Sequence, residues 1–579
     1  MGLILAGIVV SCAPAFDFIA EQFVLPTDGV RPATHTVEIK RGQSFVARDG
    51  VTLLADIYRP LGLATMPTIL VRIPLTRTAS NQIRADVIAR YWAKRGYTVV
   101  IQGTRGRYGS GGEFYPLIHE RADGLETLKW LQDQEWFDGR LAMWGGSSFG
   151  HTQWSVADQV SPGASALHVH IVSTNFRRMF FPGEAFALES ALYWTIRSRG
   201  AEDRTVDVGD LERAVRTLPV HEADDRAIGD TEFYNDWLRH KDNREFWEAI
   251  DGRDRAQTLQ APILLLAGWY DPFLPGQLDD FKVIADRTTS SVGSKSRLIV
   301  GPWGHATSIR VPGMETEIPY RESTLESSLP WFDFHLKVTT DRLTMSRVRL
   351  FVMGENRWRD EQEWPLARTV YTPYYFHSAG HANTVEGDGR LKGEVPTEDE
   401  ASDQYVYDPL DPVPTRGGAM LGDRSGIITQ NEVESRNDVL VYSTAALTKP
   451  LEVTGPLHAV LYVGTDAPST DFTVKLVDVH PDGVAYNVSD GILRREYPRA
   501  VDSGREPIEI KVELGPTSHV FLAGHRLRVE VSSSNFPRFD RNLNTGKDPS
   551  LAIKAQVAHQ VFFHQATYPS HILLPIIPR

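Results

Sequence analysis

The chain has 579 residues, more than a single hydrophobic core usually holds, so we expect two to four domains. Hydrophobic residues at 41% and charged residues at 23% are ordinary for a globular protein. The net charge of −13, with no dense basic run, argues against a nucleic-acid partner, because phosphate binding needs clustered Lys and Arg. The single cysteine, Cys12, excludes an intrachain disulfide and a cysteine-based metal site.

The first twelve residues are apolar, but the run is too short to span a bilayer, so we predict no transmembrane segment. The run also lacks the basic start of a secretory signal, and we expect a cytoplasmic protein. The alternative rests on Val9-Val10-Ser11-Cys12, which resembles the cleavage box of a bacterial lipoprotein. In that case the protein would be exported and anchored through Cys12.

The first clear pattern begins near residue 38. Two runs typical of strands, 43–47 and 53–58, flank the turn Arg48-Asp49-Gly50 and predict a hairpin. Continuous apolar runs then alternate with helical stretches, which is typical of buried parallel strands with helices on both faces. These runs are 68–71, 98–101, 141–144, 166–172, 263–266 and 298–300. The pattern predicts an α/β domain with a doubly wound sheet.

Two stretches depart from this alternation. Residues 176–255 lack such runs and are rich in Arg, Asp, Glu and aromatic residues at helical spacing, which predicts an inserted helical cap. From residue 347 onward, short alternating strands such as 348–352 and 527–531 lie between Pro, Gly and Asp turns and predict an all-β sandwich. The predicted order is an N-terminal extension (1–37), an α/β domain in two parts (38–175 and 256–346), the cap (176–255) and the β domain (347–579).

A glycine-rich motif follows the apolar run 141–144, with the sequence Gly145-Gly146-Ser147-Ser148-Phe149-Gly150. A nucleophilic serine requires a sharp strand-to-helix turn, and flanking glycines let strand and helix approach closely. The pattern G-x-S-x-G selects Ser148, whereas G-x-S-x-x-G selects Ser147. The spacing from the strand favours Ser147, because Gly145 then follows the strand directly, but the residues alone leave both frames open.

An acid and a histidine follow two later strands: run 263–266 leads to Asp271, and run 298–300 leads to His305. Parallel sheets bring such strand ends to one edge, where their active sites lie. A serine nucleophile needs a base, and the base needs an orienting carboxylate. The chain order Ser, Asp, His is that of α/β hydrolases. We therefore predict a catalytic triad of Asp271, His305 and a serine, with Ser147 favoured over Ser148, that cleaves a small-molecule ester or amide through an acyl-enzyme, without cofactor or metal.

His168 and His170 offer a competing metal site, because they lie two apart on a predicted strand and share one face. No supporting carboxylate and histidine partners appear at the required spacing, and the H-E-x-x-H motif is absent. We interpret the pair as ordinary strand histidines.

From about Val46 to its end, the chain resembles the CocE/NonD serine hydrolases, relatives of the X-Pro dipeptidyl-peptidases. The resemblance includes Gly-Trp-Tyr-Asp at 268–271 and Gly-Pro-Trp-Gly-His at 301–305, and further stretches at 101–106, 141–154, 349–354, 471–473 and 532–537. The family pattern G-x-S-Y-x-G places the nucleophile on Ser147 and Ser148 at the tyrosine position. The resemblance also implies that the C-terminal β domain is a jelly roll and that the protein forms a homodimer.

The resemblance implies further site residues. Trp194 on the cap and Phe273, just past Asp271, would line an aromatic acyl pocket, which Leu421 of the β domain would also reach. In the family, the oxyanion is held by the backbone N–H after the nucleophile, here that of Ser148, and by a tyrosine hydroxyl. Leu75 occupies the position of that tyrosine and has no donor. We therefore expect an active esterase that is weakened or differently selective.

Three alternatives compete with an ordinary esterase. An X-Pro dipeptidyl-peptidase and an α-amino-acid ester hydrolase or acylase both need carboxylates near the site to hold a substrate ammonium. Asp271 is followed by Pro272-Phe273-Leu274-Pro275, which offers none and favours an uncharged or aromatic acyl group. A hydrolase-fold binding protein without activity is the non-enzymatic alternative. Leu75 motivates it, and the complete triad argues against it.

Overall fold

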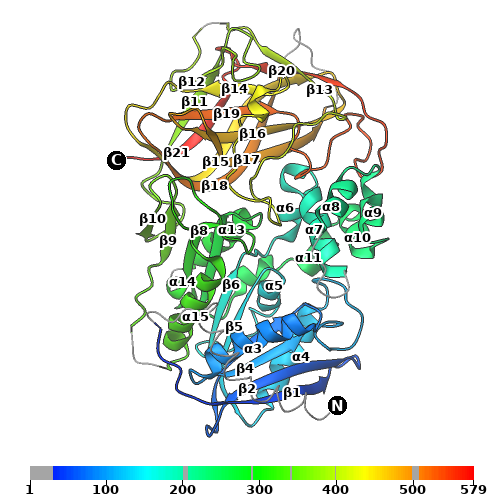
Figure 1. Ribbon diagram of the computed structural model, residues 1–579, viewed down its shortest axis with the longest axis vertical. Helices are drawn as coiled ribbons and strands as arrows, with labels where there is room; N and C mark the ends of the chain where they lie inside the picture. The colour runs from blue at the N-terminus through cyan, green and yellow to red at the C-terminus, as the bar shows by residue number, and fades with distance from the viewer. Residues whose placement is uncertain (1–29, 200–206, 288–290, 339–341, 398, 498–506) are drawn as a thin grey trace, which may run out of the picture.

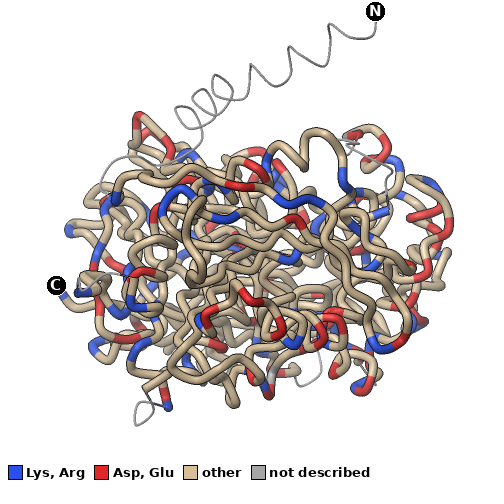
Figure 2. Tube along the Cα trace, turned by 90° about the horizontal axis from the view of Figure 1, so that it is seen from below, with Lys and Arg blue, Asp and Glu red and all other residues tan. Residues whose placement is uncertain are grey.

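The computed structural model describes residues 30–199, 207–287, 291–338, 342–397, 399–497 and 507–579. The segment with Cys12 that resembles a lipoprotein cleavage box, which underlies the alternative of an exported protein, and most of the N-terminal extension lie outside these residues. In the described part of the chain, no helix combines the length and apolar character needed to cross a membrane. On the face seen in Figure 2, Lys and Arg lie interspersed with Asp and Glu.

A ten-stranded sheet forms the lower part of the molecule in Figure 1, in the order β1-β2-β4-β3-β5-β6-β7-β8-β9-β10. The strands from β3 to β9 pair in parallel, and β1, β2 and β10 add antiparallel edges. The predicted hairpin is confirmed as β1 and β2. The strands are β1 (Val37–Val46), β2 (Thr52–Pro60), β3 (Met66–Ile73), β4 (Thr98–Gly103), β5 (Phe137–Gly146), β6 (Ser165–His170), β7 (Ile263–Tyr270), β8 (Arg297–Gly304), β9 (Val348–Val352) and β10 (Arg357–Glu361).

Successive residues of a strand point to opposite faces of the sheet, so a sheet whose strands are apolar on both faces must be covered on both. Helices cover both faces of this sheet. Leu70 and Val100 belong to one hydrophobic core, whereas their neighbours Ile69 and Val99 belong to a second. The prediction of a doubly wound α/β sheet is therefore confirmed. The helices are α3 (Ala79–Ala93), α4 (Glu120–Gln132), α5 (Ser148–Trp154), α13 (Leu274–Ala285), α14 (Ser291–Lys295) and α15 (Tyr320–His335).

The chain between β6 and β7 is helical and lies beside the β domain at one end of the sheet (Figure 1). Stacked aromatic side chains fill it: the rings of Trp194 and Trp237 lie 5.0 Å apart and nearly parallel. Its helices are α6 (Phe176–Phe180), α7 (Leu188–Arg199), α8 (Val208–Val215), α9 (Ala223–Ala227), α10 (Glu232–Arg239), α11 (Arg244–Ile250) and α12 (Arg253–Thr258), with two short 3₁₀ turns, Pro182–Glu184 and Val220–Glu222.

The C-terminal part is all β, as predicted, with a core of its own. Its strands are β11 (Val370–His377), β12 (Arg390–Lys392), β13 (Asp403–Tyr407), β14 (Leu440–Ser443), β15 (Leu451–Thr465), β16 (Ser469–Val479), β17 (Ala485–Glu496), β18 (Ile508–Phe521), β19 (Arg526–Ser532), β20 (Ala558–Phe563) and β21 (His571–Ile577), with a 3₁₀ turn at Val433–Ser435.

The assignment of 348–352 to this β-sandwich is wrong. Those residues form β9, which pairs in parallel with β8 and extends the α/β sheet, and β10 follows as its antiparallel edge. Alternating polarity suits an edge of either sheet, so the pattern alone could not tell them apart. The α/β sheet therefore continues beyond the boundary predicted at residue 347.

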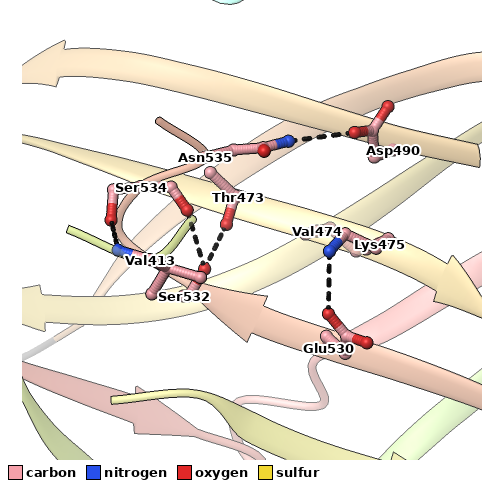
Figure 3. Close-up of a pocket in the computed structure, with 9 residues that line it drawn as sticks. All are labelled: Val413, Thr473, Val474, Lys475, Asp490, Glu530, Ser532, Ser534 and Asn535. Carbon is pink, nitrogen blue, oxygen red and sulfur yellow. Dashed lines mark hydrogen bonds and ion pairs between the residues drawn. The ribbon is translucent and has the colours of Figure 1, made fainter. Parts of the chain in front are cut away.

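A small polar cavity lies inside the β domain (Figure 3). Lys475 Nζ lies 3.1 Å from Glu530 Oε2, and Thr473 Oγ1 lies 2.6 Å from Ser532 Oγ. These pairs join β16 to the neighbouring strand β19. Burial raises the pKa of Glu530, and the Lys475 ammonium opposes that effect. The cavity is thus held by mutually paired groups of the sandwich.

Candidate active site

Ser147 occupies a strained turn between β5 and α5, with φ of +54° and ψ of −130°. Non-glycine residues rarely adopt positive φ, and such strain concentrates at functional positions. Glycines on both sides permit the turn. A Cβ on Gly145 would lie 2.5 Å from Cβ of Phe149, and one on Gly150 would lie 2.5 Å from Cγ1 of Val172. The close approach of strand and helix that the motif predicts therefore occurs.

Strand β6 supports this turn from behind. The backbone N–H of Ser147 donates to the carbonyl of His170 at 3.0 Å. His170 Nδ1 lies 2.7 Å from the Tyr320 hydroxyl, and His168 Nε2 lies 3.0 Å from Ser327 Oγ. Burial lowers the pKa of His168 to about 3 and that of His170 well below its usual value, so both rings are neutral near pH 7. The two histidines serve the packing behind the serine.

The structure brings Ser147, His305 and Asp271 together. Nε2 of His305 lies 3.0 Å from Oγ of Ser147, and Nδ1 of His305 lies 2.7 Å from Oδ2 of Asp271. The Asp271 side chain is fully buried, and its Oδ1 accepts a 2.7 Å hydrogen bond from the backbone N–H of Phe273. The carboxylate is therefore fixed by two contacts. This geometry lets the imidazole take a proton from the serine while the carboxylate holds its tautomer.

Aromatic side chains connect this arrangement to the cap. The ring of Phe273 lies 5.7 Å from that of His305, and Phe176 lies 5.3 Å from Phe273 and 6.5 Å from Trp194. The predicted pocket residues Phe273 and Trp194 thus belong to one aromatic row with Phe176 between them. Sequence reasoning missed Phe176. The signal that could have found it is its place as the first aromatic residue of the predicted cap.

A loop of the β domain packs against the cap and against the residue before His305. The backbone N–H of Leu421 donates to Ser190 Oγ of α7 at 3.1 Å, and Leu421 is buried. A Cβ added to Gly422 would lie 2.9 Å from the Tyr193 ring, and one added to Gly304 would lie 2.6 Å from Ser425 Oγ. The third predicted pocket residue, Leu421, therefore contacts α7 at Ser190, which lies one helical turn before Trp194.

The two predicted oxyanion positions lie at neighbouring strand ends, because β3 and β5 are adjacent in the sheet. Ser148 is the first residue of α5, and N–H groups in a first helical turn have no partner within the helix. Leu75 follows β3 and is 37% exposed, and its carbonyl accepts from the Tyr108 N–H at 3.0 Å. The carbonyl of the next residue, Thr76, accepts from Asn81 Nδ2 at 2.9 Å.

A serine on a strand–helix turn, bonded to a histidine and a buried aspartate on this sheet, defines the class of α/β-fold serine hydrolases. Comparisons with known proteins support this class. The protein-family model for X-Pro dipeptidyl-peptidase (S15 family) matches residues 49–307. The family model for the X-Pro dipeptidyl-peptidase C-terminal non-catalytic domain matches residues 344–573. Cocaine esterase of a Rhodococcus species is 38% identical over 570 residues, covering 92% of this chain and 97% of that protein. The chain belongs to the CocE/NonD family of serine hydrolases and is a carboxylesterase-like enzyme.

Solved structures show the same fold. An aminopeptidase from a marine sediment archaeon (Thaumarchaeota) superposes with a TM-score of 0.79 at 25% identity, covering 96% of this chain and 99% of that one. An α-amino acid ester hydrolase gives a TM-score of 0.79 at 23% identity, covering 95% of this chain and 98% of that one. The combination of α/β sheet, cap and β domain is therefore shared along nearly the whole chain.

Proposed function

We propose that this enzyme hydrolyses a carboxylic ester through an acyl-enzyme on Ser147. His305 takes the serine proton during attack and returns it to the leaving alcohol, while Asp271 fixes the imidazole tautomer and stabilises its cation. Water then attacks the acyl-enzyme with His305 again as the base. The observation that carries this proposal is the continuous hydrogen-bonded chain from Ser147 Oγ to Asp271 Oδ2. The similarity to cocaine esterase supports an ester as the substrate.

We propose further that the acyl group is uncharged and aromatic. The ring of Phe273 packs beside that of His305, and the ring of Phe176 lies beyond Phe273. Such rings offer faces on which another aromatic group can pack. The carboxylate on the cap helix α7, Glu189, is buried and already paired with Arg424 at 2.8 Å. The charge of Glu189 is therefore already offset by a guanidinium within the protein.

A comparison of two substrates tests this proposal against the peptidase alternative. We expect rapid hydrolysis of a nitrophenyl benzoate and at most weak hydrolysis of an Ala-Pro-anilide, since the latter needs an ammonium-binding carboxylate. Initial rates by absorbance give kcat/KM for each. A higher kcat/KM for the anilide would contradict the proposal and favour an X-Pro dipeptidyl-peptidase.

Leu75 provides a second test, because it stands where the family has a tyrosine donor. We expect Leu75→Tyr to raise kcat on an aryl ester by up to about 100-fold, since one oxyanion donor is worth about 3 kcal/mol. The matched control is Leu75→Phe, which adds the same ring without the hydroxyl and should not raise kcat. Equal turnover of the two variants would show that the hydroxyl does not reach the oxyanion.

A further inference from the structure

Three histidines surround one buried carboxylate in the β domain, outside the proposed active site. His525 Nδ1 lies 2.8 Å from Asp478 Oδ1, and His519 Nε2 lies 2.9 Å from Asp478 Oδ2. His480 Nε2 lies 3.7 Å from Asp478 Oδ2. We refer to these four residues as the Asp478 cluster.

Four segments of the β domain build the cluster. Asp478 lies near the end of β16, and His480 follows in the hairpin to β17. His519 lies on β18, and His525 lies in the turn between β18 and β19. The ring of His480 packs 4.3 Å from that of His525 and 4.9 Å from that of Tyr486. The position of His480 beside the carboxylate is therefore fixed by packing on two sides.

The donor set fits a borderline divalent cation better than a hard one. Zn²⁺ prefers imidazole nitrogen and carboxylate oxygen in a tetrahedron, whereas Mg²⁺ and Ca²⁺ prefer oxygen alone. Potential ligand atoms of Asp478, His480 and His525 all lie within 4.8 Å of one another. With bonds of 2.0–2.1 Å, the edge of a zinc tetrahedron is about 3.3 Å. His525 Nδ1 lies 2.8 Å from Asp478 Oδ1 and His480 Nε2 lies 3.7 Å from Asp478 Oδ2, so the two histidines face different oxygens of the carboxylate at distances close to that edge.

We propose that Asp478, His480 and His525 bind one Zn²⁺ ion, with His519 holding the carboxylate in position. His519 would then donate Nε2–H to Asp478, as groups behind a ligand commonly do in metal sites. A solvent molecule would complete the tetrahedron on the side of His480.

Access and protonation both suit this role. The side chain of His480 is 27% exposed, while those of His525 and Asp478 are buried, so an ion can enter past His480. Burial lowers the pKa of His480; the Asp478 carboxylate opposes this effect, and the imidazole of His525 adds to it. A neutral imidazole is the form that ligates metals.

The bound ion would link the end of β16 to the turn between β18 and β19, close to the contact between the β domain and the α/β sheet. The residues on either side of His519 bond to Met353, just after β9: the Met353 N–H donates to Ser518 at 3.0 Å, and the Val520 N–H donates to Met353 at 2.9 Å. In Figure 1, β18 lies next to strand β9 of the α/β sheet and next to helix α13. Zinc should therefore raise the melting temperature of the enzyme, as any ligand specific to the folded state does.

Zinc titration of the full-length enzyme, prepared without a histidine tag and dialysed against chelator, tests the proposal. By calorimetry we expect one Zn²⁺ per chain, no comparable Mg²⁺ binding, and a higher melting temperature with zinc. His480→Ala and His525→Ala should each weaken binding by at least about tenfold. The matched control is His559→Ala. His559 forms an exposed pair with Asp466 at 2.7 Å in the same domain, and its loss should leave zinc affinity unchanged.

Ester hydrolysis serves as the folding check, because none of these side chains belongs to the proposed active site. His480→Ala alters a partly exposed side chain in a hairpin, so it should fold even if His525→Ala does not. Absence of saturable zinc binding in the wild type would overturn the proposal. Unchanged zinc affinity in a folded His480→Ala variant would overturn it equally, and the cluster would then be a hydrogen-bonded Asp–His network without an ion.

Discussion

Replacing Ser147 with alanine is expected to lower kcat for an aryl ester by at least about 10⁴-fold, because removal of a triad nucleophile abolishes the acyl-enzyme path. KM should change little, since the serine hydroxyl is not needed to hold the acyl group. Steady-state hydrolysis of a nitrophenyl ester, at enzyme concentrations high enough to see the residual rate, measures both parameters.

Ser148→Ala is the matched control for this prediction. It removes a hydroxyl from the adjacent residue but keeps the backbone N–H that we assign to the oxyanion, so kcat should stay within a fewfold of the wild type. The two variants together decide between the two glycine–serine frames. Loss of activity in Ser148→Ala, with activity retained in Ser147→Ala, would reverse the assignment.

Replacing Asp271 with asparagine is the second large effect, with an expected fall in kcat of about 10⁴-fold near neutral pH. Asp271 Oδ2 accepts the bond from His305 Nδ1, while its Oδ1 accepts from the Phe273 N–H. An amide can serve only one of these donors, and its NH₂ group favours the wrong tautomer of His305. Nitrophenyl ester hydrolysis measured across pH reads out this loss.

Asp279→Asn provides the control, because Asp279 lies nearby on α13 but is an exposed carboxylate paired with Arg178. Its rate should match that of the wild type. If Asp271→Asn kept more than a tenth of wild-type kcat, then Asp271 would not be the residue that orients His305.

The fold class followed from the sequence because buried parallel strands are continuous apolar runs, as at Ile263–Tyr270. The strand Val348–Val352 was misassigned, since its alternation carries no information about whether β8 or the β-sandwich would pair with it. That choice depends on tertiary neighbours. The same limit applies to Leu421: the family resemblance named it, but no local pattern predicts its contact with Ser190, which joins residues 231 positions apart.

The candidate site was predictable as far as its residues are tied to strand ends. Asp271 and His305 directly follow β7 and β8, and Ser147 follows β5, so topology alone brings them to one edge. Phe176 and the Asp478 cluster were not found, for different reasons. Phe176 gains its place only through the packing of the cap, and the histidines around Asp478 come from three elements that meet only in the folded β domain.

Labelling with a fluorophosphonate, followed by mapping of the adduct by peptide mass, tests the central claim most directly. The reagent reacts with a serine whose hydroxyl is activated by a histidine. His305 Nε2 lies 3.0 Å from Ser147 Oγ and can activate it in this way. We expect one adduct per chain, on Ser147, formed in parallel with loss of esterase activity. An adduct on Ser148, or no adduct on an active enzyme, would contradict the account.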